Sequence, residues 1–236
     1  MHRQLARWPQ SRLRSREGRR ELLRGRDVAV IYAIAVAGTE AILGLLPDQV
    51  HQRAVIRCST NLFNLHHSPL SVLAASAFVV NNALSLWQLP WLVWAYGEAQ
   101  RWVGRAATVI VAILGHVGAT LFVATMLAAS LGHGRLEHSA AHVSDVGVSY
   151  GLVCISGFVV SRVPQRYRTA YVVALTLFAA GPLVVVPTYT ALGHVCALGL
   201  GLGLALLASR VTAAAEKGPV RGTDRRRHRR GARSTA

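Results

Sequence analysis

The chain has 236 residues, of which 52% are hydrophobic and only 15% are charged, yet it carries a formal net charge of +16. A soluble domain carries about 25% charged residues, so these values exclude an ordinary soluble enzyme, a disulfide scaffold and a disordered protein. The charge is concentrated at the two ends, with nine arginines in residues 1–26 and eight arginines and one lysine in residues 210–236. The composition therefore predicts an all-α, multi-pass membrane protein with two basic tails.

Six apolar stretches approach the roughly 20 residues that a helix needs to cross a bilayer. In chain order they are 28–46, 70–96, 106–131, 146–163, 170–186 and 191–208. The second is interrupted by Asn81, Asn82 and Pro90. Such an interruption needs protein neighbours or a water-filled cavity, because bare backbone is not tolerated against lipid. We therefore predict a bundle of six membrane-spanning helices over residues 28–210.

The basic residues predict the orientation of these helices. With the N-terminus in the cytoplasm, 23 of the 26 Lys and Arg residues lie on the inner side, as the positive-inside rule requires. Both tails, residues 1–27 and 211–236, are then cytoplasmic; we expect the second to be disordered, and both to bind anionic lipid headgroups rather than nucleic acid. Heavy use of arginine, with Lys217 the only lysine, is typical of a G+C-rich bacterial genome, so we place the chain in a bacterial cytoplasmic membrane.

Ser149 and His194 are predicted to lie at the same depth, on two helices that run in the same direction. Both helices enter from the outer side, and each residue lies four positions further on, about 6 Å deeper. Small-xxx-small pairs in both helices permit their backbones to approach closely. These pairs are Gly147 with Gly151, and Gly199 with Gly203. A serine hydroxyl needs an adjacent base to act as a nucleophile, so the two residues predict a Ser-His dyad supplied with water from outside.

The other ionisable side chains within the apolar stretches are Glu40 and His116. His116 lies about 15 Å from the inner side, deeper than Ser149, and we interpret it as structural. With His194, these residues alternatively suit the proton path of a small transporter or channel. The outer loop before the fourth helix carries three histidines without a metal-binding motif, so we interpret it as a solvated loop and predict no metal site. These histidines are His133, His138 and His142.

Four segments share their order and residue types with one known family. They are Tyr96-Gly97-Glu98 through Trp102-Val103-Gly104, Leu114-Gly115-His116-Val117-Gly118-Ala119-Thr120, Gly147-Val148-Ser149-Tyr150-Gly151, and Gly193-His194 followed by Ala197, Gly199 and Gly203. Over about residues 28–210 the chain thereby resembles the rhomboid family of intramembrane serine proteases. The basic six-span form of that family also has both termini in the cytoplasm.

The resemblance implies that Ser149 is the nucleophile and His194 the general base of a protease. Members of the family cleave transmembrane segments of other membrane proteins through an acyl-enzyme, without a metal or organic cofactor. The residues expected to bind the oxyanion or the substrate are Gly147, Asn81 and Asn82. Those expected to support the site are His116, Tyr150 and Glu98.

Two features differ from the family pattern. Tyr150 follows the serine where the family has glycine, and residues 80–90 contain no counterpart of the family's His-x-x-x-Asn pattern, which helps to bind the oxyanion. Loss of one oxyanion donor commonly lowers turnover by about 10²–10³-fold. The alternative interpretation is therefore a proteolytically inactive rhomboid-like protein that binds membrane partners.

Overall fold

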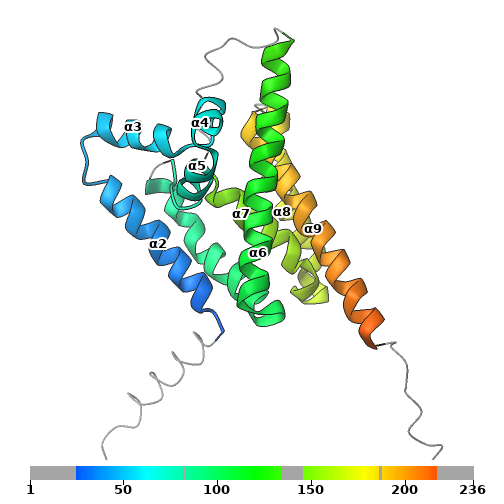
Figure 1. Ribbon diagram of the computed structural model, residues 1–236. Helices are drawn as coiled ribbons and strands as arrows, with labels where there is room; N and C mark the ends of the chain where they lie inside the picture. Colours follow the sequence, from blue (N-terminus) through cyan, green and yellow to red (C-terminus); the bar gives the residue numbers. More distant parts are fainter. Residues whose placement is uncertain (1–24, 82, 134–145, 186–187, 217–236) are drawn as a thin grey trace, which may run out of the picture. The chain divides into compact units, whose positions relative to one another are not determined.

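The computed structural model describes residues 25–81, 83–133, 146–185 and 188–216, with side chains as far as Val211 (Figure 1). All regular structure in these ranges is helical, which confirms the prediction of an all-α fold for the part described. The chain divides into two compact units, one ending at Ala205 and one beginning at Leu206. The two tails over 1–24 and 217–236, and the residues Asn82, His138 and His142, lie outside the described residues.

Helix α2 covers Asp27–Leu43, and four short elements then separate it from the next long helix. These are α3 (Asp48–Cys58), α4 (Leu62–His67), α5 (Pro69–Ser76) and the 3-10 helix η1 (Ala83–Gln88). Local residues explain the breaks, because Pro47 and Pro69 stand at helix starts and the Asn61 side chain caps α4 by accepting from Asn64 N at 2.8 Å. The stretch 70–96, predicted to be interrupted, is divided here into α5, η1 and the first part of the next long helix, which begins at Leu89.

Helix α6 (Leu89–Gly132) contains a sharp change of direction at Gly104. Gly104 has φ 84° and ψ 175°, a conformation that only glycine adopts readily. The Thr108 hydroxyl donates to the Gly104 carbonyl at 2.8 Å and stabilises the turn. Figure 1 shows the two halves of α6 running in different directions from this point, as expected for the predicted second and third apolar helices.

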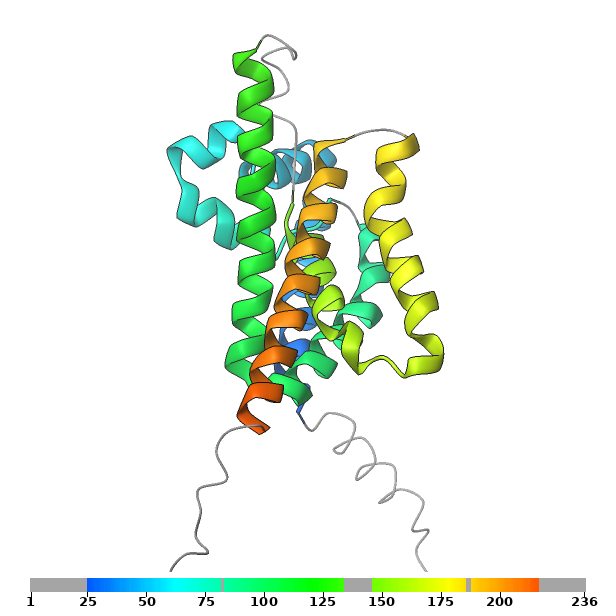
Figure 2. The ribbon, with the colours of Figure 1, turned by 90° about the vertical axis from the view of Figure 1, so that its right-hand side faces the viewer.

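The last three long elements surround the buried centre of the first unit. They are α7 (Val148–Phe158), continued by the 3-10 helix η3 (Val159–Arg162), then α8 (Gln165–Val185) and α9 (Tyr189–Glu216). Nearly every residue of α7 is buried, because this helix packs against both α6 and α8. Figure 2 shows α7 between the long second half of α6 and α8.

Within the residues that the structure describes, three helices are long and apolar enough to cross a bilayer. They are Ala83–Gly132, which includes η1, Gln165–Val185 and Tyr189–Val211. Val148–Arg162 is also apolar but shorter, and α2 has 17 residues. The prediction of a multi-pass membrane protein is thus confirmed by helix length and composition.

Candidate active site

Ser149 and His194 are in direct contact. Ser149 is the second residue of α7, and His194 lies in the second turn of α9. Ser149 Oγ is 2.9 Å from His194 Nε2, and both residues are half-buried. With Nε2 unprotonated, the serine hydroxyl donates to the imidazole, which is the arrangement that a nucleophilic serine and its base require.

The His194 ring is held between aromatic side chains from two neighbouring helices. Its centroid lies 5.2 Å from that of Tyr150, edge to face, and 5.6 Å from that of Phe178 in α8. Tyr150 is fully buried, and a Cβ at position 193 would overlap its ring, so Gly193 is the residue that lets the tyrosine reach the imidazole. Tyr150 therefore contacts the histidine through its ring.

Helices α7 and α9 approach backbone to backbone just below this pair. A Cβ at Gly201 would overlap the carbonyl group of Cys154, and one at Gly157 would lie 3.0 Å from Leu198 O. Gly199 and Gly203 were expected to make this contact, and that interpretation is wrong, because a Cβ at either position meets nothing within 4 Å. Helix α9 contains four glycines, three of them at every second position from 199 to 203. Their spacing alone therefore does not show which face of the helix meets α7.

The groups expected to bind an oxyanion lie in different environments. Ser149 belongs to the first turn of α7, where backbone N–H groups have no acceptor within the helix. The Gly147 N–H group is already engaged, because it donates to Ser76 O at 3.0 Å. Asn81 is exposed and, among the residues that the structure describes, forms no hydrogen bond with Ser149 or His194.

The side chain of His116, which belongs to α6, lies against the start of α7. This level differs from the depth that was inferred by counting residues. Its ring occupies the space that a Cβ at Gly147 would fill, two positions before Ser149. The count failed because α7 and η3, over Val148–Arg162, give only about 24 Å of helix. That length is less than the roughly 30 Å thickness of a bilayer core, so counting residues along an assumed full crossing misplaces the first turn of α7 relative to its neighbours.

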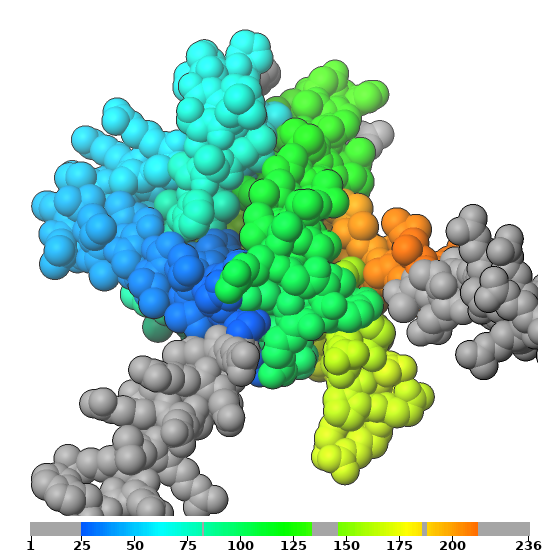
Figure 3. Space-filling model, turned by 60° about the horizontal axis from the view of Figure 1, so that its bottom comes forward, coloured from blue at the N-terminus to red at the C-terminus, as the bar shows by residue number. Residues whose placement is uncertain are grey.

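A second polar cluster joins the start of α2 to the part of α6 next to its bend at Gly104. Glu98 contacts Arg26 at 3.4 Å and also pairs with Arg101, so it supports this junction rather than touching Ser149 or His194. A hydrogen bond from Gln100, and then the neighbouring Arg105 guanidinium at 2.8 Å, lower the pKa of Asp27 below its ordinary value. Figure 3 shows the start of α2 packed against α6.

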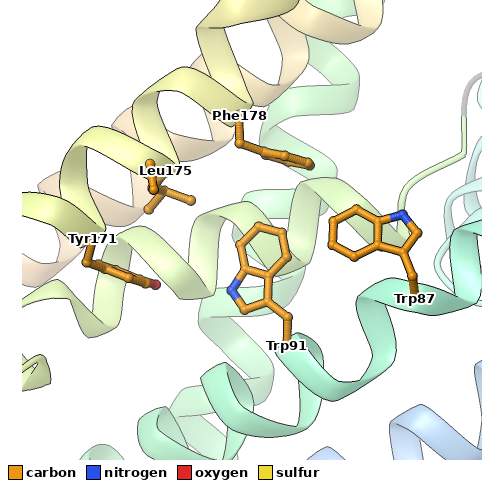
Figure 4. A pocket seen from close by; sticks show the side chains of 6 residues that line it. Trp87, Trp91, Tyr171, Leu175 and Phe178 are labelled. Carbon is orange, nitrogen blue, oxygen red and sulfur yellow. The ribbon is translucent and has the colours of Figure 1, made fainter.

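An apolar pocket of about 210 Å³ lies against Phe178, whose ring also neighbours His194, and sequence reasoning did not identify it. Its lining residues come from η1 and α6 on one side and from α8 on the other: Trp87, Trp91, Tyr171, Ala174, Leu175 and Phe178. Figure 4 shows the two indoles facing the α8 side chains. Phe178 belongs to both places, because its ring lies 5.2 Å from that of Trp91 and 5.6 Å from that of His194. The only sequence signal was the presence of aromatic residues in the second and fifth apolar stretches.

The remaining ionisable residues do not gather around one point. In the described ranges no group of three or more His, Cys, Asp and Glu side chains could hold a metal ion. His133, the one outer-loop histidine described, bonds to Ala129 O at 2.6 Å. Glu40 is buried in α2, whereas His116 forms hydrogen bonds with α5 and His194 with Ser149. In the part of the chain that the structure describes, these three residues therefore form no continuous hydrogen-bonded chain.

Comparison with known proteins gives one match. A family model described as "Rhomboid-like protein" matches residues 24–214, which is most of the chain. No curated protein and no solved structure matches the chain.

Proposed function

The chain belongs to the rhomboid-like protein family, and on this premise we propose that it is an intramembrane serine protease that cleaves transmembrane segments of other membrane proteins. The observation that carries the proposal is the 2.9 Å contact between Ser149 Oγ and His194 Nε2. Both residues belong to apolar helices, where burying a polar pair costs free energy, so the pair points to a function.

The proposed reaction uses the two side chains in sequence. His194 Nε2 accepts the hydroxyl proton while Ser149 Oγ attacks the scissile carbonyl carbon, and the resulting oxyanion lies at the N-terminal end of α7, near the Ser149 N–H group. The imidazolium then gives its proton to the leaving amine as the peptide bond breaks. Water attacks the acyl-enzyme, His194 accepts its proton, and the collapse of the second tetrahedral intermediate returns a proton to Ser149 and releases the carboxylate product.

The apolar pocket beside His194 supports a hydrophobic substrate. Its walls are aromatic and aliphatic, and Phe178 connects it to the imidazole. A transmembrane segment presents side chains of the same chemistry, and it reaches the pocket within the bilayer without leaving lipid. The proposed substrates and partners are therefore membrane proteins, and the reaction needs no metal or organic cofactor.

The proposed topology has six crossings. They are α2, the two halves of α6 on either side of Gly104, α7 with η3, α8 and α9. Both termini lie in the cytoplasm of a bacterium, where the basic tails meet the anionic headgroups of the inner leaflet. In this proposed arrangement Arg162, at the end of η3, and Arg166 and Arg168, in the first turn of α8, lie on the same inner side.

A specific observation also favours an inactive rhomboid-like protein that retains membrane partners. Asn81 is exposed, the Gly147 N–H group is occupied by Ser76 O, and His116 Nε2 faces Leu73 O. The described residues therefore offer the oxyanion chiefly the backbone of the first turn of α7. Partner binding that survives loss of both Ser149 and His194 would support this second candidate.

Covalent labelling with a fluorophosphonate probe separates the two candidates. We expect the purified chain to be labelled, and both Ser149→Ala and His194→Ala to lose the label. Ser156→Ala is a matched control, because this serine lies on the same helix but its hydroxyl donates to Leu152 O at 2.7 Å. Absence of labelling in folded protein, with an active rhomboid protease labelled in parallel, would refute the protease.

A further inference from the structure

The carboxyl end of α5 is held by donors from three other parts of the molecule. Carbonyl groups in the last turn of a helix have no partner within it, and at membrane depth water does not replace one. Here three such carbonyls, in and directly after the last turn of α5, are satisfied by tertiary contacts. The contacts are Tyr32 OH to Ala77 O at 2.6 Å, His116 Nε2 to Leu73 O at 2.9 Å, and Gly147 N to Ser76 O at 3.0 Å.

His116 adds a side-chain link between α5 and the start of α7 to the direct bond from Gly147 N to Ser76 O. Its side chain is 6% exposed, and Nε2 also lies 3.2 Å from Ser76 Oγ. The same imidazole covers Gly147, since a Cβ at that position would overlap the ring. Gly147 is therefore enclosed by the His116 ring and by the Ser76 carbonyl that accepts its N–H group.

We propose that His116 is a positioning residue for Ser149. Gly147 precedes α7 directly and its carbonyl accepts from Tyr150 N at 3.1 Å, so its position sets the first turn of the helix. That turn carries both the Ser149 hydroxyl, aimed at His194, and the Ser149 N–H group proposed to meet the oxyanion. This inference rests on the proposed function.

The contacts of His116 assign it to positioning rather than to chemistry. Its Nε2 faces Leu73 O and Ser76 Oγ, whereas the base contact to Ser149 comes from His194. If α5 and α7 lose this connection, the hydroxyl shifts relative to the imidazole. A misplacement of about 1 Å commonly lowers the rate by about 10²-fold.

The test compares His116→Leu with His116→Gln. Leucine fills part of the same space but has no hydrogen-bond donor, whereas the amide nitrogen of glutamine can replace imidazole Nε2 as the donor. The control is Thr120→Val, which removes a buried hydroxyl one turn further along the same helix. For each full-length variant we measure the maximal rate of fluorophosphonate labelling, the probe affinity and the melting temperature.

We expect His116→Leu to lower the maximal labelling rate by about 10²-fold while the probe affinity stays unchanged. His116→Gln should recover part of the lost labelling rate, and Thr120→Val should be labelled at the rate of the unaltered chain. Gly147→Ala, whose Cβ would displace the ring, should lower the rate even if the His116 variants fold poorly. A labelling rate of His116→Leu or of Gly147→Ala equal to that of the unaltered chain would overturn the inference. It would also be overturned if the labelling rates of His116→Leu and His116→Gln fell only in proportion to their melting temperatures. An unlabelled unaltered chain would instead refute the proposed function, and this inference with it.

Discussion

Replacement of Gly201 by alanine tests whether the close approach of α7 and α9 sets the distance between Ser149 and His194. The new Cβ would overlap the Cys154 carbonyl oxygen and would lie 2.9 Å from its carbonyl carbon and 3.1 Å from its Cα. These are backbone atoms of a buried helix, so no flexible side chain can move aside to accept the methyl group.

The size of the effect follows from these distances. Carbon atoms in contact lie about 3.5–4.0 Å apart, so the two helices must separate by on the order of 1 Å. The hydrogen bond from Ser149 to His194, now 2.9 Å long, would then exceed the usual limit of about 3.2 Å for such a bond. We expect the labelling rate of Ser149 to fall by about 10²-fold and stability to fall by about 1–3 kcal/mol, as is typical of an overpacked core.

The assay is the rate of fluorophosphonate labelling, with the melting temperature measured on the same preparations. Gly199→Ala and Gly203→Ala are matched controls on the same helix, because a Cβ at either position meets nothing within 4 Å. Labelling of Gly201→Ala at the rate of these two controls would refute the argument that backbone contact between α7 and α9 sets the geometry of the pair.

Three further predictions concern stability. Gly104→Ala should lower the free energy of unfolding by about 1–3 kcal/mol, because φ is 84° at this position. Gly181→Ala in α8, where a Cβ meets nothing within 4 Å, is the control and should not lower it. Equal melting temperatures of the two variants would contradict this prediction. Tyr32→Phe should lower the free energy of unfolding by about 1 kcal/mol, because the half-buried Ala77 carbonyl loses its donor, and denaturant unfolding that shows no loss would contradict it. The pKa of Asp27 is lowered in the folded chain, so its contribution to stability is complete above the ordinary carboxyl pKa of about 4 and is lost as pH falls through the lower folded value. Thermal unfolding between neutral and acidic pH should therefore depend less on pH in Asp27→Asn, and an unchanged dependence would oppose this assignment.

The sequence predicted those features that depend on counting along parallel helices. Ser149 and His194 each lie near the N-terminal start of an apolar stretch, and the structure brings their side chains together. The break in the second stretch was also predictable, because Asn81 and Pro90 interrupt it, and the structure provides the protein neighbours that such a break needs.

Features that depend on helix rotation or on tertiary depth were not predictable. Spacing did not distinguish Gly201 from Gly199, since both are small and lie two positions apart in a helix rich in glycine. The level of His116 could not be obtained by counting, because it depends on where α7 begins within the membrane. The aromatic wall around Phe178 brings together η1, α6 and α8, and no local pattern shows which stretches meet.

Proteolysis in liposomes tests the proposed protease most directly. The full chain is reconstituted together with a panel of single-span reporter proteins, and the cleavage products are identified by mass spectrometry. We predict a cut in or next to the apolar segment of a reporter, lost in Ser149→Ala and in His194→Ala but retained in Ser156→Ala. The same cleavage by the Ser149→Ala chain, or no cleavage of any reporter by a chain whose Ser149 takes the probe, would contradict the account.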